Sequence, residues 1–269
     1  MNNASYEFHT YGCKVNTYDT GLMQKNLGPH LDSNNASPPP RVHIVNTCAV
    51  TAEATKEALR KVRKIKSKDP FSTIVVTGCG AQVDTEHFAS LAGVDLVVAN
   101  SHKGYLPQIL DQYFKGELPT KVFKDSIFRK EDLEVGGGIE AAHTRSFLKI
   151  QDGCNSFCTY CVIPFARGKS RSISKEILIQ KINHLHTAGV LEVVLTGVHI
   201  GDWQQSGFGL NDLGLEDLIE GILKETQMPR LRLTSLEPPE LTPRLLDLFS
   251  DARLCPHFHM SMQSANTET

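Results

Sequence analysis

The sequence lacks any long apolar run, since no stretch of its 269 residues stays hydrophobic for long enough to cross a bilayer. Its first ten residues also lack the basic and apolar regions of a secretory signal. Neither sign of charge dominates, because 28 Lys and Arg stand against 30 Asp and Glu. We therefore expect no membrane span and a cytoplasmic location, and any polyanion partner must be met by local patches of charge.

Cysteines are the feature that the sequence does have, seven in all. In a reducing compartment such residues are better explained as metal ligands, catalytic thiols or core residues than as disulfides. Three of them, Cys154, Cys158 and Cys161, form a CxxxCxxC motif directly after a predicted strand. Three thiolates leave the fourth iron of a [4Fe-4S] cluster open, and that iron can chelate S-adenosylmethionine while the cluster reduces its sulfonium. The alternative is a zinc site, but zinc sites pair two CxxC elements or add His.

Cys13, Cys48 and Cys79 each follow the end of another predicted strand. Because the carboxyl ends of parallel strands share one edge of a sheet, these thiols can converge on a second cluster. Gly12, Gly78 and Gly80 would allow the backbone to approach closely there. The alternative is that the three cysteines are small buried residues of the core.

Strands and helices alternate along the chain, which predicts α/β folding with a parallel sheet. A charged stretch with three consecutive glycines, residues 126–144, predicts a linker between two domains. The second half fits either the opening of a barrel or another open sheet. The predicted strands are 6–10, 42–47, 73–77, 95–99, 147–151, 191–196, 230–235 and 257–262, and the clearest predicted helices are 52–68, 175–188, 215–225 and 242–249.

Four segments resemble the methylthiotransferases, radical S-adenosylmethionine enzymes that insert sulfur and a methyl group into a C–H bond. They are Thr10-Tyr-Gly-Cys-Lys-Val-Asn16, Asn46-Thr-Cys-Ala-Val50, Thr77-Gly-Cys-Gly80 and Gln151-Asp-Gly-Cys-Asn-Ser-Phe-Cys-Thr-Tyr-Cys-Val-Ile-Pro164. The resemblance implies an open parallel-sheet (flavodoxin- or Rossmann-like) domain at 1–125, the linker at 126–144 and a partial radical-SAM (β/α) barrel at 145–269. Members of the family continue into further barrel strands and an RNA-binding TRAM domain, which this sequence lacks, so we expect a fragment or a truncated product.

Within the family, the chain is most similar to the branch that methylthiolates C2 of N6-threonylcarbamoyladenosine beside the tRNA anticodon. Lys14-Val-Asn16, the run 165–172 and Leu195-Thr-Gly-Val-His-Ile200 carry this likeness. The resemblance implies two [4Fe-4S] clusters: a catalytic, radical-generating one on Cys154, Cys158 and Cys161, and an auxiliary one on Cys13, Cys48 and Cys79. Alternatives are action on isopentenyl-adenosine tRNA or a ribosomal protein, or an iron-sulfur fragment without activity.

Further expectations concern the cofactor and the partners. Gly197, Ser235, Glu237 and Gln263 lie at predicted strand ends, the positions from which a barrel builds its site, and are candidate contacts of S-adenosylmethionine. Close behind the CxxxCxxC motif, Arg167, Lys169 and Arg171 are candidate phosphate contacts for tRNA. The reaction also needs an electron donor, such as a flavodoxin or a ferredoxin.

Overall fold

The computed structural model describes residues 4–28, 40–131, 133, 145–206, 212–264 and 266, and the chain divides into two compact units. Unit 1 comprises residues 1–137 and 156–168, whereas unit 2 comprises residues 138–155 and 169–269. The linker predicted at 126–144 therefore begins within unit 1, where η3 (Ile127–Arg129) buries Ile127. Residues 134–144 of that linker lie outside the described residues. The second passage of the chain through unit 1, at 156–168, is not foreseen by the sequence.

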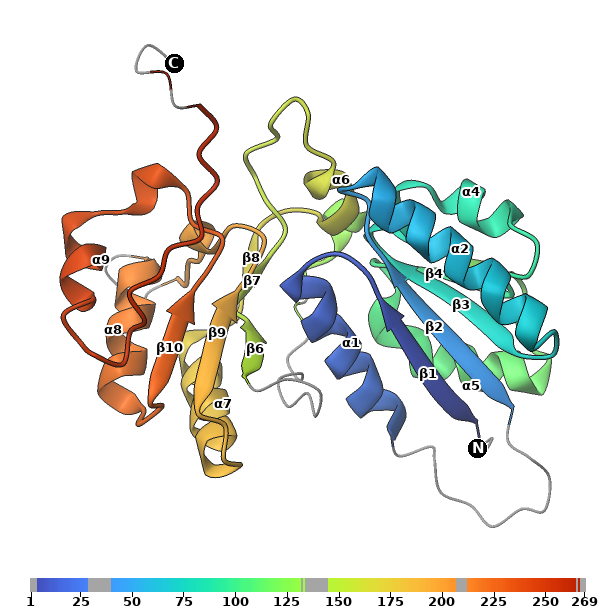
Figure 1. Ribbon diagram of the computed structural model, residues 1–269, viewed down its shortest axis with the longest axis horizontal. Coiled ribbons are helices and arrows are strands. Elements are labelled where there is room, and N and C mark those ends of the chain that lie inside the picture. The colour runs from blue at the N-terminus through green and yellow to red at the C-terminus, as the bar shows by residue number, and fades with distance from the viewer. Residues whose placement is uncertain are drawn as a thin grey trace. The chain divides into compact units, whose positions relative to one another are not determined.

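Unit 1 is built on a five-stranded parallel sheet whose strands lie side by side in chain order (Figure 1). This confirms the open parallel sheet and four of its strands. The fifth strand has only two residues, too short for a hydrophobic period to reveal it. The strands are β1 (Ser5–Thr10), β2 (Arg41–Thr47), β3 (Thr73–Gly78), β4 (Leu96–Ala99) and β5 (Val122–Phe123).

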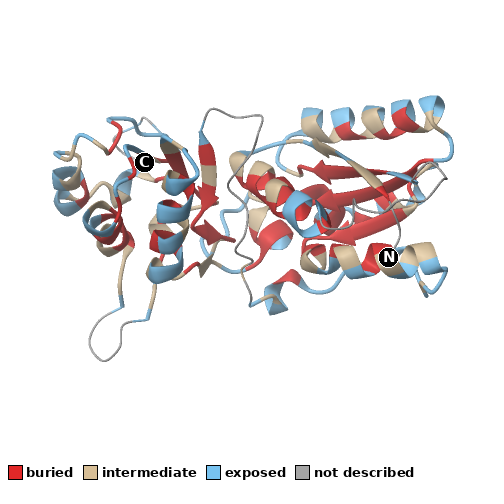
Figure 2. Ribbon diagram, turned by 90° about the horizontal axis from the view of Figure 1, so that it is seen from below, coloured by how far each residue is buried: buried red, intermediate tan, exposed pale blue. Residues whose placement is uncertain are grey.

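Helices cover both faces of this sheet. Apolar side chains of α1 (Lys14–Leu27) and α5 (Leu106–Lys115) pack on one face, and those of α2 (Ala52–Lys68), α3 (Cys79–Val83) and α4 (Thr85–Ser90) on the other. The central strands β2, β3 and β4 are almost entirely buried between them, whereas β1 and β5 at the two edges are partly exposed (Figure 2). The helix predicted at 52–68 has the predicted bounds, and Thr51 caps it by accepting a hydrogen bond from the Ala54 amide. None of the helices in the described residues is long and apolar enough to cross a membrane.

Unit 2 repeats a strand-then-helix order around a three-stranded parallel sheet, as expected for the opening of a radical-SAM barrel. Beside it, β7 (Gln151–Asp152) and β8 (Arg171–Ser172) pair antiparallel, so they bracket the segment that belongs to unit 1. The three helices lie within one residue of their predicted bounds at each end. The parallel strands are β6 (Ser146–Lys149), β9 (Glu192–Thr196) and β10 (Arg230–Leu233), and the helices are α7 (Lys175–Thr187), α8 (Leu215–Glu225) and α9 (Pro243–Leu248).

The strand predicted at 257–262 is wrong. In place of a ladder, the structure has isolated parallel bridges, from Leu231 to Leu254 and from Leu236 to Met260. Pro256 supplies no backbone N–H, and the residues that follow it through Gln263 are exposed. The described residues therefore give this segment no continuous strand partner.

Candidate functional site

Cys13, Cys48 and Cys79 lie at the carboxyl ends of three neighbouring strands of unit 1. Cys13 precedes α1 as its N-cap residue, Cys48 directly follows β2, and Cys79 is the first residue of α3. Since β1, β2 and β3 are parallel and adjacent, the three loops meet at one edge of the sheet. The structure thus places the three thiols at the edge that the sequence predicts, while their role as ligands stays a prediction.

Two glycines bring these loops into close contact. Gly12 has φ +97°, and a Cβ there would lie 2.8 Å from Cβ and 2.9 Å from Sγ of Cys48. Gly78 has φ +96°, and its Cβ would lie 2.3 Å from the Thr47 carbonyl oxygen. Both positions combine a left-handed backbone with a space that a side chain would fill, so only glycine is compatible with this packing.

Two asparagine side chains make hydrogen bonds with the cysteine loops. Asn16 is fully buried, and its Nδ2 donates to the carbonyl oxygens of Tyr11 at 2.8 Å and Thr47 at 3.0 Å. The Sγ of Cys79 lies 4.0 Å from Oδ1 of Asn16 and 3.6 Å from Nδ2 of Asn100. One amide therefore spans the first two loops, and a second one donates toward the sulfur of the third.

Several buried polar atoms at this edge have no hydrogen-bond partner. Among the described residues they include Oδ1 of Asn46, Oγ1 of Thr77 and Oδ1 of Asn100, which lie at or just after the ends of β2, β3 and β4. Buried groups are normally satisfied, so unpaired ones in a row indicate a place prepared for water or a further group. Together with three cysteines that form no disulfide, two of them buried, this chemistry fits an iron-sulfur cluster.

Arg167 belongs to this edge and not to a phosphate-binding surface. Its guanidinium donates to Oδ1 of Asn16 at 2.6 Å and to Oδ2 of Asp19 at 3.2 Å, and only 2% of the residue is exposed. Lys103, in the helical turn η2 (Lys103–Tyr105), donates to the same Asp19 oxygen at 3.1 Å. The interpretation of Arg167 as a tRNA contact is therefore wrong, because a buried side chain cannot reach a phosphate.

The second cysteine set is divided between the two units. Cys154 lies in unit 2, two residues after β7, whereas Cys158 and Cys161 lie in the segment 156–168 of unit 1, just before α6 (Ile163–Arg167). The Cys161 amide donates to the Cys158 carbonyl at 2.8 Å, which forms a tight turn between these two thiols. All three cysteines form no disulfide and are at least partly exposed. Their joint binding of a radical cluster stays a prediction.

His199 and Asp202 are polar neighbours of Cys154 that the sequence reasoning did not select. One ligand atom from each of the three residues lies within 4.8 Å of the other two. His199 is hydrogen-bonded through Nε2 to Glu240, and this bond raises the pKa of His199 to about 9, against the opposing effect of burial. The sequence signal that could have selected His199 is its position, three residues after the carboxyl end of β9.

Gln151 holds the loop that carries Cys154 against the loop after β9. Its Nε2 donates to the Gly153 carbonyl at 2.7 Å and to Oγ of Ser170 at 2.8 Å. Its Oε1 accepts the amides of Val198 at 3.1 Å and His199 at 3.0 Å, and the residue is fully buried. All hydrogen-bonding positions of one side-chain amide are thus used to join two loops of unit 2.

Of the candidate contacts of S-adenosylmethionine, Gly197, Ser235 and Glu237 follow strand ends as expected, whereas Gln263 follows no strand because the one predicted at 257–262 is not formed. Gly197 follows β9, and a Cβ there would lie 2.8 Å from Oε1 of Gln151. Ser235 has a left-handed backbone, φ +58°, and its carbonyl accepts the Ile200 amide at 3.1 Å. Glu237 is half-buried at the start of η5 (Pro238–Glu240), and Gln263 is exposed. Their contact with a cofactor stays a prediction.

Three aromatic side chains gather beside Cys158 in unit 1. Phe128 and Phe157 stack with ring centroids 6.1 Å apart, and Phe165 meets both edge-on at 6.0 and 6.2 Å. Each is between 37% and 55% exposed, an unusual amount of open aromatic surface for one cluster.

Comparison with known families finds one match in each half of the chain. Residues 5–99 match the model of Uncharacterized protein family UPF0004, and residues 148–269 match the Radical SAM superfamily. Among solved structures, the chain is similar to a radical S-adenosylmethionine methyltransferase, TsrM, from Kitasatospora setae, with a TM-score of 0.61 and 14% identity over 100% of this chain and 62% of that one. At that identity the likeness concerns the fold alone.

Curated relatives match nearly the whole chain. This chain is 36% identical over 264 residues to the threonylcarbamoyladenosine tRNA methylthiotransferase MtaB of Aquifex aeolicus, and the match covers 96% of this chain and 63% of the relative. The enzyme of the same name from Bacillus subtilis is 32% identical, with 98% and 58% covered. A tRNA-2-methylthio-N(6)-dimethylallyladenosine synthase of Staphylococcus saprophyticus is 30% identical, with 96% and 51% covered. The chain thus spans less than two thirds of the length of these relatives.

Proposed function

Because the chain belongs to the methylthiotransferases of the radical SAM superfamily, we propose that the protein methylthiolates C2 of N6-threonylcarbamoyladenosine in tRNA. The similarity to relatives named for this reaction supports the choice of substrate. The observation that carries the proposal is the presence of two cysteine sets in one chain. One set lies at a single sheet edge of unit 1, and the other forms the CxxxCxxC motif.

In this proposal Cys13, Cys48 and Cys79 bind an auxiliary [4Fe-4S] cluster. The glycine-lined approach of the three loops and the unpaired buried oxygens of Asn46, Thr77 and Asn100 support it. Asn16 fixes two of the loops, and Asn100 donates toward one ligand sulfur. Hydrogen bonds of this kind orient thiolate ligands and tune the cluster that they hold.

Cys154, Cys158 and Cys161 bind the second cluster, and Gly197, Ser235, Glu237 and Gln263 contact S-adenosylmethionine. When bound, the two clusters and S-adenosylmethionine supply the sulfur, the methyl group and the radical that activates C2. The residues of the chain hold the two clusters and S-adenosylmethionine in position. Gln151 fixes the Cys154 loop, and the carboxyl ends of β9 and β10 present the cofactor contacts.

The partners of this reaction are tRNA and an electron donor such as a flavodoxin or a ferredoxin. Exposed Lys169 and half-buried Arg171 are available for phosphates. The open rings of Phe128, Phe157 and Phe165 offer faces on which unpaired bases can stack. A tRNA substrate is consistent with the cytoplasmic location that the sequence predicts.

A second candidate substrate is isopentenyl-adenosine tRNA, since a relative named for dimethylallyladenosine is 30% identical. The deciding experiment offers anaerobically reconstituted protein two tRNAs, one with threonylcarbamoyladenosine and one with isopentenyl-adenosine. Mass spectrometry of the digested tRNA then reports any methylthio product. We expect product on the first tRNA; product on the second alone would reassign the substrate.

Variants separate the chemistry from the substrate. Iron content and electron paramagnetic resonance are measured on a Cys13, Cys48, Cys79→Ala triple variant and on a Cys154, Cys158, Cys161→Ala triple variant. Each should lose half of the iron, and only the first should still cleave S-adenosylmethionine. If either triple variant keeps all its iron, the two-cluster assignment fails. If both clusters form but no tRNA is modified, the chain is an iron-sulfur fragment without activity.

A further inference from the structure

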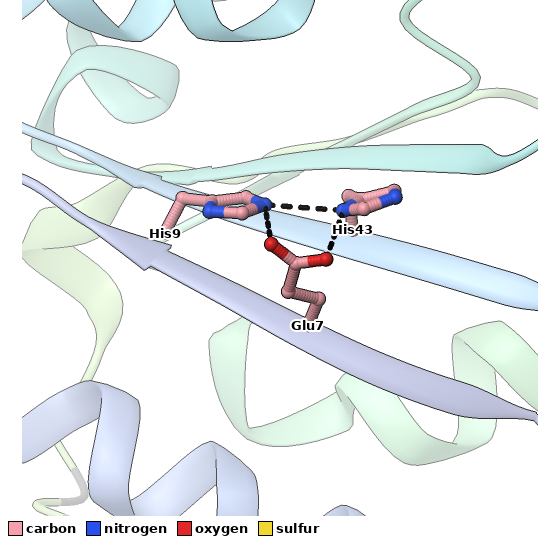
Figure 3. A group of neighbouring side chains, drawn as sticks. All are labelled: Glu7, His9 and His43. Atoms are coloured by element: carbon pink, nitrogen blue, oxygen red, sulfur yellow. Dashed lines mark hydrogen bonds and ion pairs between the residues drawn. The ribbon is translucent and has the colours of Figure 1, made fainter. Parts of the chain in front are cut away.

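Two histidines and a glutamate gather on one face of the unit 1 sheet, outside both cysteine sets (Figure 3). Glu7 and His9 are alternate residues of β1, so their side chains point to the same face. His43 is the residue of β2 directly opposite Glu7 in the parallel register. Tyr6 and Phe8 point the other way, into the core beneath α1 and α5.

Their ligand atoms form a compact triangle. Nε2 of His9 lies 3.1 Å from Nδ1 of His43, and each nitrogen lies 3.4 Å from a carboxylate oxygen of Glu7. Neighbouring ligands about 2.0–2.1 Å from a tetrahedral zinc ion are separated by about 3.3 Å. The observed separations, which involve Oε1 of Glu7 for His9 and Oε2 for His43, are close to those between neighbouring ligands of one ion, and they leave a further position open to water.

We propose that Glu7, His9 and His43 form a binding site for a divalent transition-metal ion, with Zn²⁺ as the reference ion. Two imidazoles and one carboxylate are ligands that first-row divalent ions accept in catalytic and structural sites. The imidazole rings lie nearly parallel, 5.3 Å apart at an angle of 15°, so the two strands already hold both nitrogens toward the same point.

Access and local charge are compatible with the site. Both histidine side chains are nearly buried, at 8% and 11% exposure, whereas Glu7 is 62% exposed and leaves a path from solvent. Burial lowers the pKa of His9 to about 4 and also lowers that of His43, so both rings are neutral ligands at neutral pH. The positive charge of Lys61 also lowers the pKa of both rings, whereas the negative charge of Glu7 raises it.

An ion at this site would fasten the edge strand β1 to its neighbour β2. β1 ends the sheet and pairs only with β2, and the described residues place Gly12 and Cys13 shortly after its last residue. An ion shared by β1 and β2 joins these strands through side chains in addition to their backbone hydrogen bonds. Without an ion, the same three residues form only a hydrogen-bonded group.

The test is a Co²⁺ and Zn²⁺ titration of the chain with its iron-sulfur clusters assembled, so that the cysteines are occupied. Calorimetry gives stoichiometry and affinity, and the visible spectrum of Co²⁺ reports nitrogen and oxygen ligands without thiolate charge transfer. Wild-type protein should bind one more ion than His43→Gln, or bind it at least ~100-fold more tightly. The matched control, His87→Gln, changes an exposed histidine of α4 and should bind as wild type.

Glu7→Gln keeps the proposal testable if His43→Gln does not fold, because Glu7 is exposed. We expect it to weaken the ion at least ~10-fold while circular dichroism stays unchanged. Equal binding by wild type, Glu7→Gln and His43→Gln overturns the site. Because none of these residues belongs to a cluster set, failure here leaves the proposed function untouched.

Discussion

Arg167 donates a 2.6 Å hydrogen bond to Oδ1 of Asn16, a residue 151 positions earlier in the chain. The same asparagine holds the carbonyl groups of Tyr11 and Thr47, so the guanidinium is joined through one amide to two of the cysteine loops. The second hydrogen bond of Arg167, to Asp19, adds a buried ion pair. α6 is thereby part of the edge of the unit 1 sheet that carries Cys13, Cys48 and Cys79.

Replacing Arg167 should destabilise unit 1 strongly. Arg167→Leu removes both buried bonds and leaves Asp19 with one cation fewer, at a cost of about 3–5 kcal/mol in the free energy of unfolding. Urea unfolding measures it. Lys169→Leu, an exposed control two residues on, should change this free energy by less than about 0.5 kcal/mol. A similar small change in Arg167→Leu would contradict the buried network.

Replacing Asn100 should lower the reduction potential of the auxiliary cluster proposed for Cys13, Cys48 and Cys79. Its Nδ2 donates both to Sγ of Cys79 and to the Ala166 carbonyl, and a hydrogen bond to a ligand sulfur stabilises the reduced cluster. Voltammetry on the Cys154, Cys158, Cys161→Ala background isolates that cluster. Asn100→Leu should shift the potential downward, whereas His102→Gln should leave it unchanged. Equal potentials in all three proteins would show that Asn100 does not reach the cluster.

Gln151→Glu should weaken unit 2 and disturb the Cys154 loop. A carboxylate cannot donate to the Gly153 carbonyl, so this buried acceptor loses its partner, at about 1–3 kcal/mol in the free energy of unfolding, whereas the Ser170 hydroxyl can turn and donate to the carboxylate. Thermal unfolding and the spectrum of the radical cluster report the two effects. Gln204→Glu makes the same change at an exposed position and serves as the control.

His199 should titrate far above an ordinary histidine in the cluster-free protein. The hydrogen bond to Glu240, aided by the charges of Asp202 and Glu237, raises its pKa to about 9. A raised pKa contributes stability that is complete below the unfolded value near 6.5 and is lost as the pH rises through about 9. Nuclear magnetic resonance of the imidazole measures the pKa directly. In Glu240→Gln the pKa should return toward 6.5; an unchanged value would assign the shift to another group.

Local patterns predicted those parts of the chain whose structure depends on neighbours in sequence. The helix 52–68 followed from its cap and its apolar spacing, and the cysteine loops followed from strands long enough to recognise. β5 has two residues and carries no such pattern. Arg167 looked like a surface cation because its partners, Asn16 and Asp19, lie in another part of the sequence.

The neighbours of Cys154 were missed for a related reason. His199 and Asp202 approach this thiol only after β9 is placed beside β6, and no spacing within the sequence reports that distance. A wider search for polar residues just after strand ends would have found His199, as it found Ser235 and Glu237. The segment 156–168 was misplaced because a short motif-bearing loop gives no indication of which core it will enter.

That segment also imposes an order on biosynthesis. The Asn100 amide donates to the Ala166 carbonyl, and Asp19 accepts from the Arg167 guanidinium, so a nascent chain that ends near residue 137 has not yet formed these two buried bonds. Domains generally mature on the ribosome from the N-terminus, at about 5–20 residues per second. Here unit 1 has all its residues only when residue 168 has emerged, and Cys158 and Cys161 emerge with the segment that completes it.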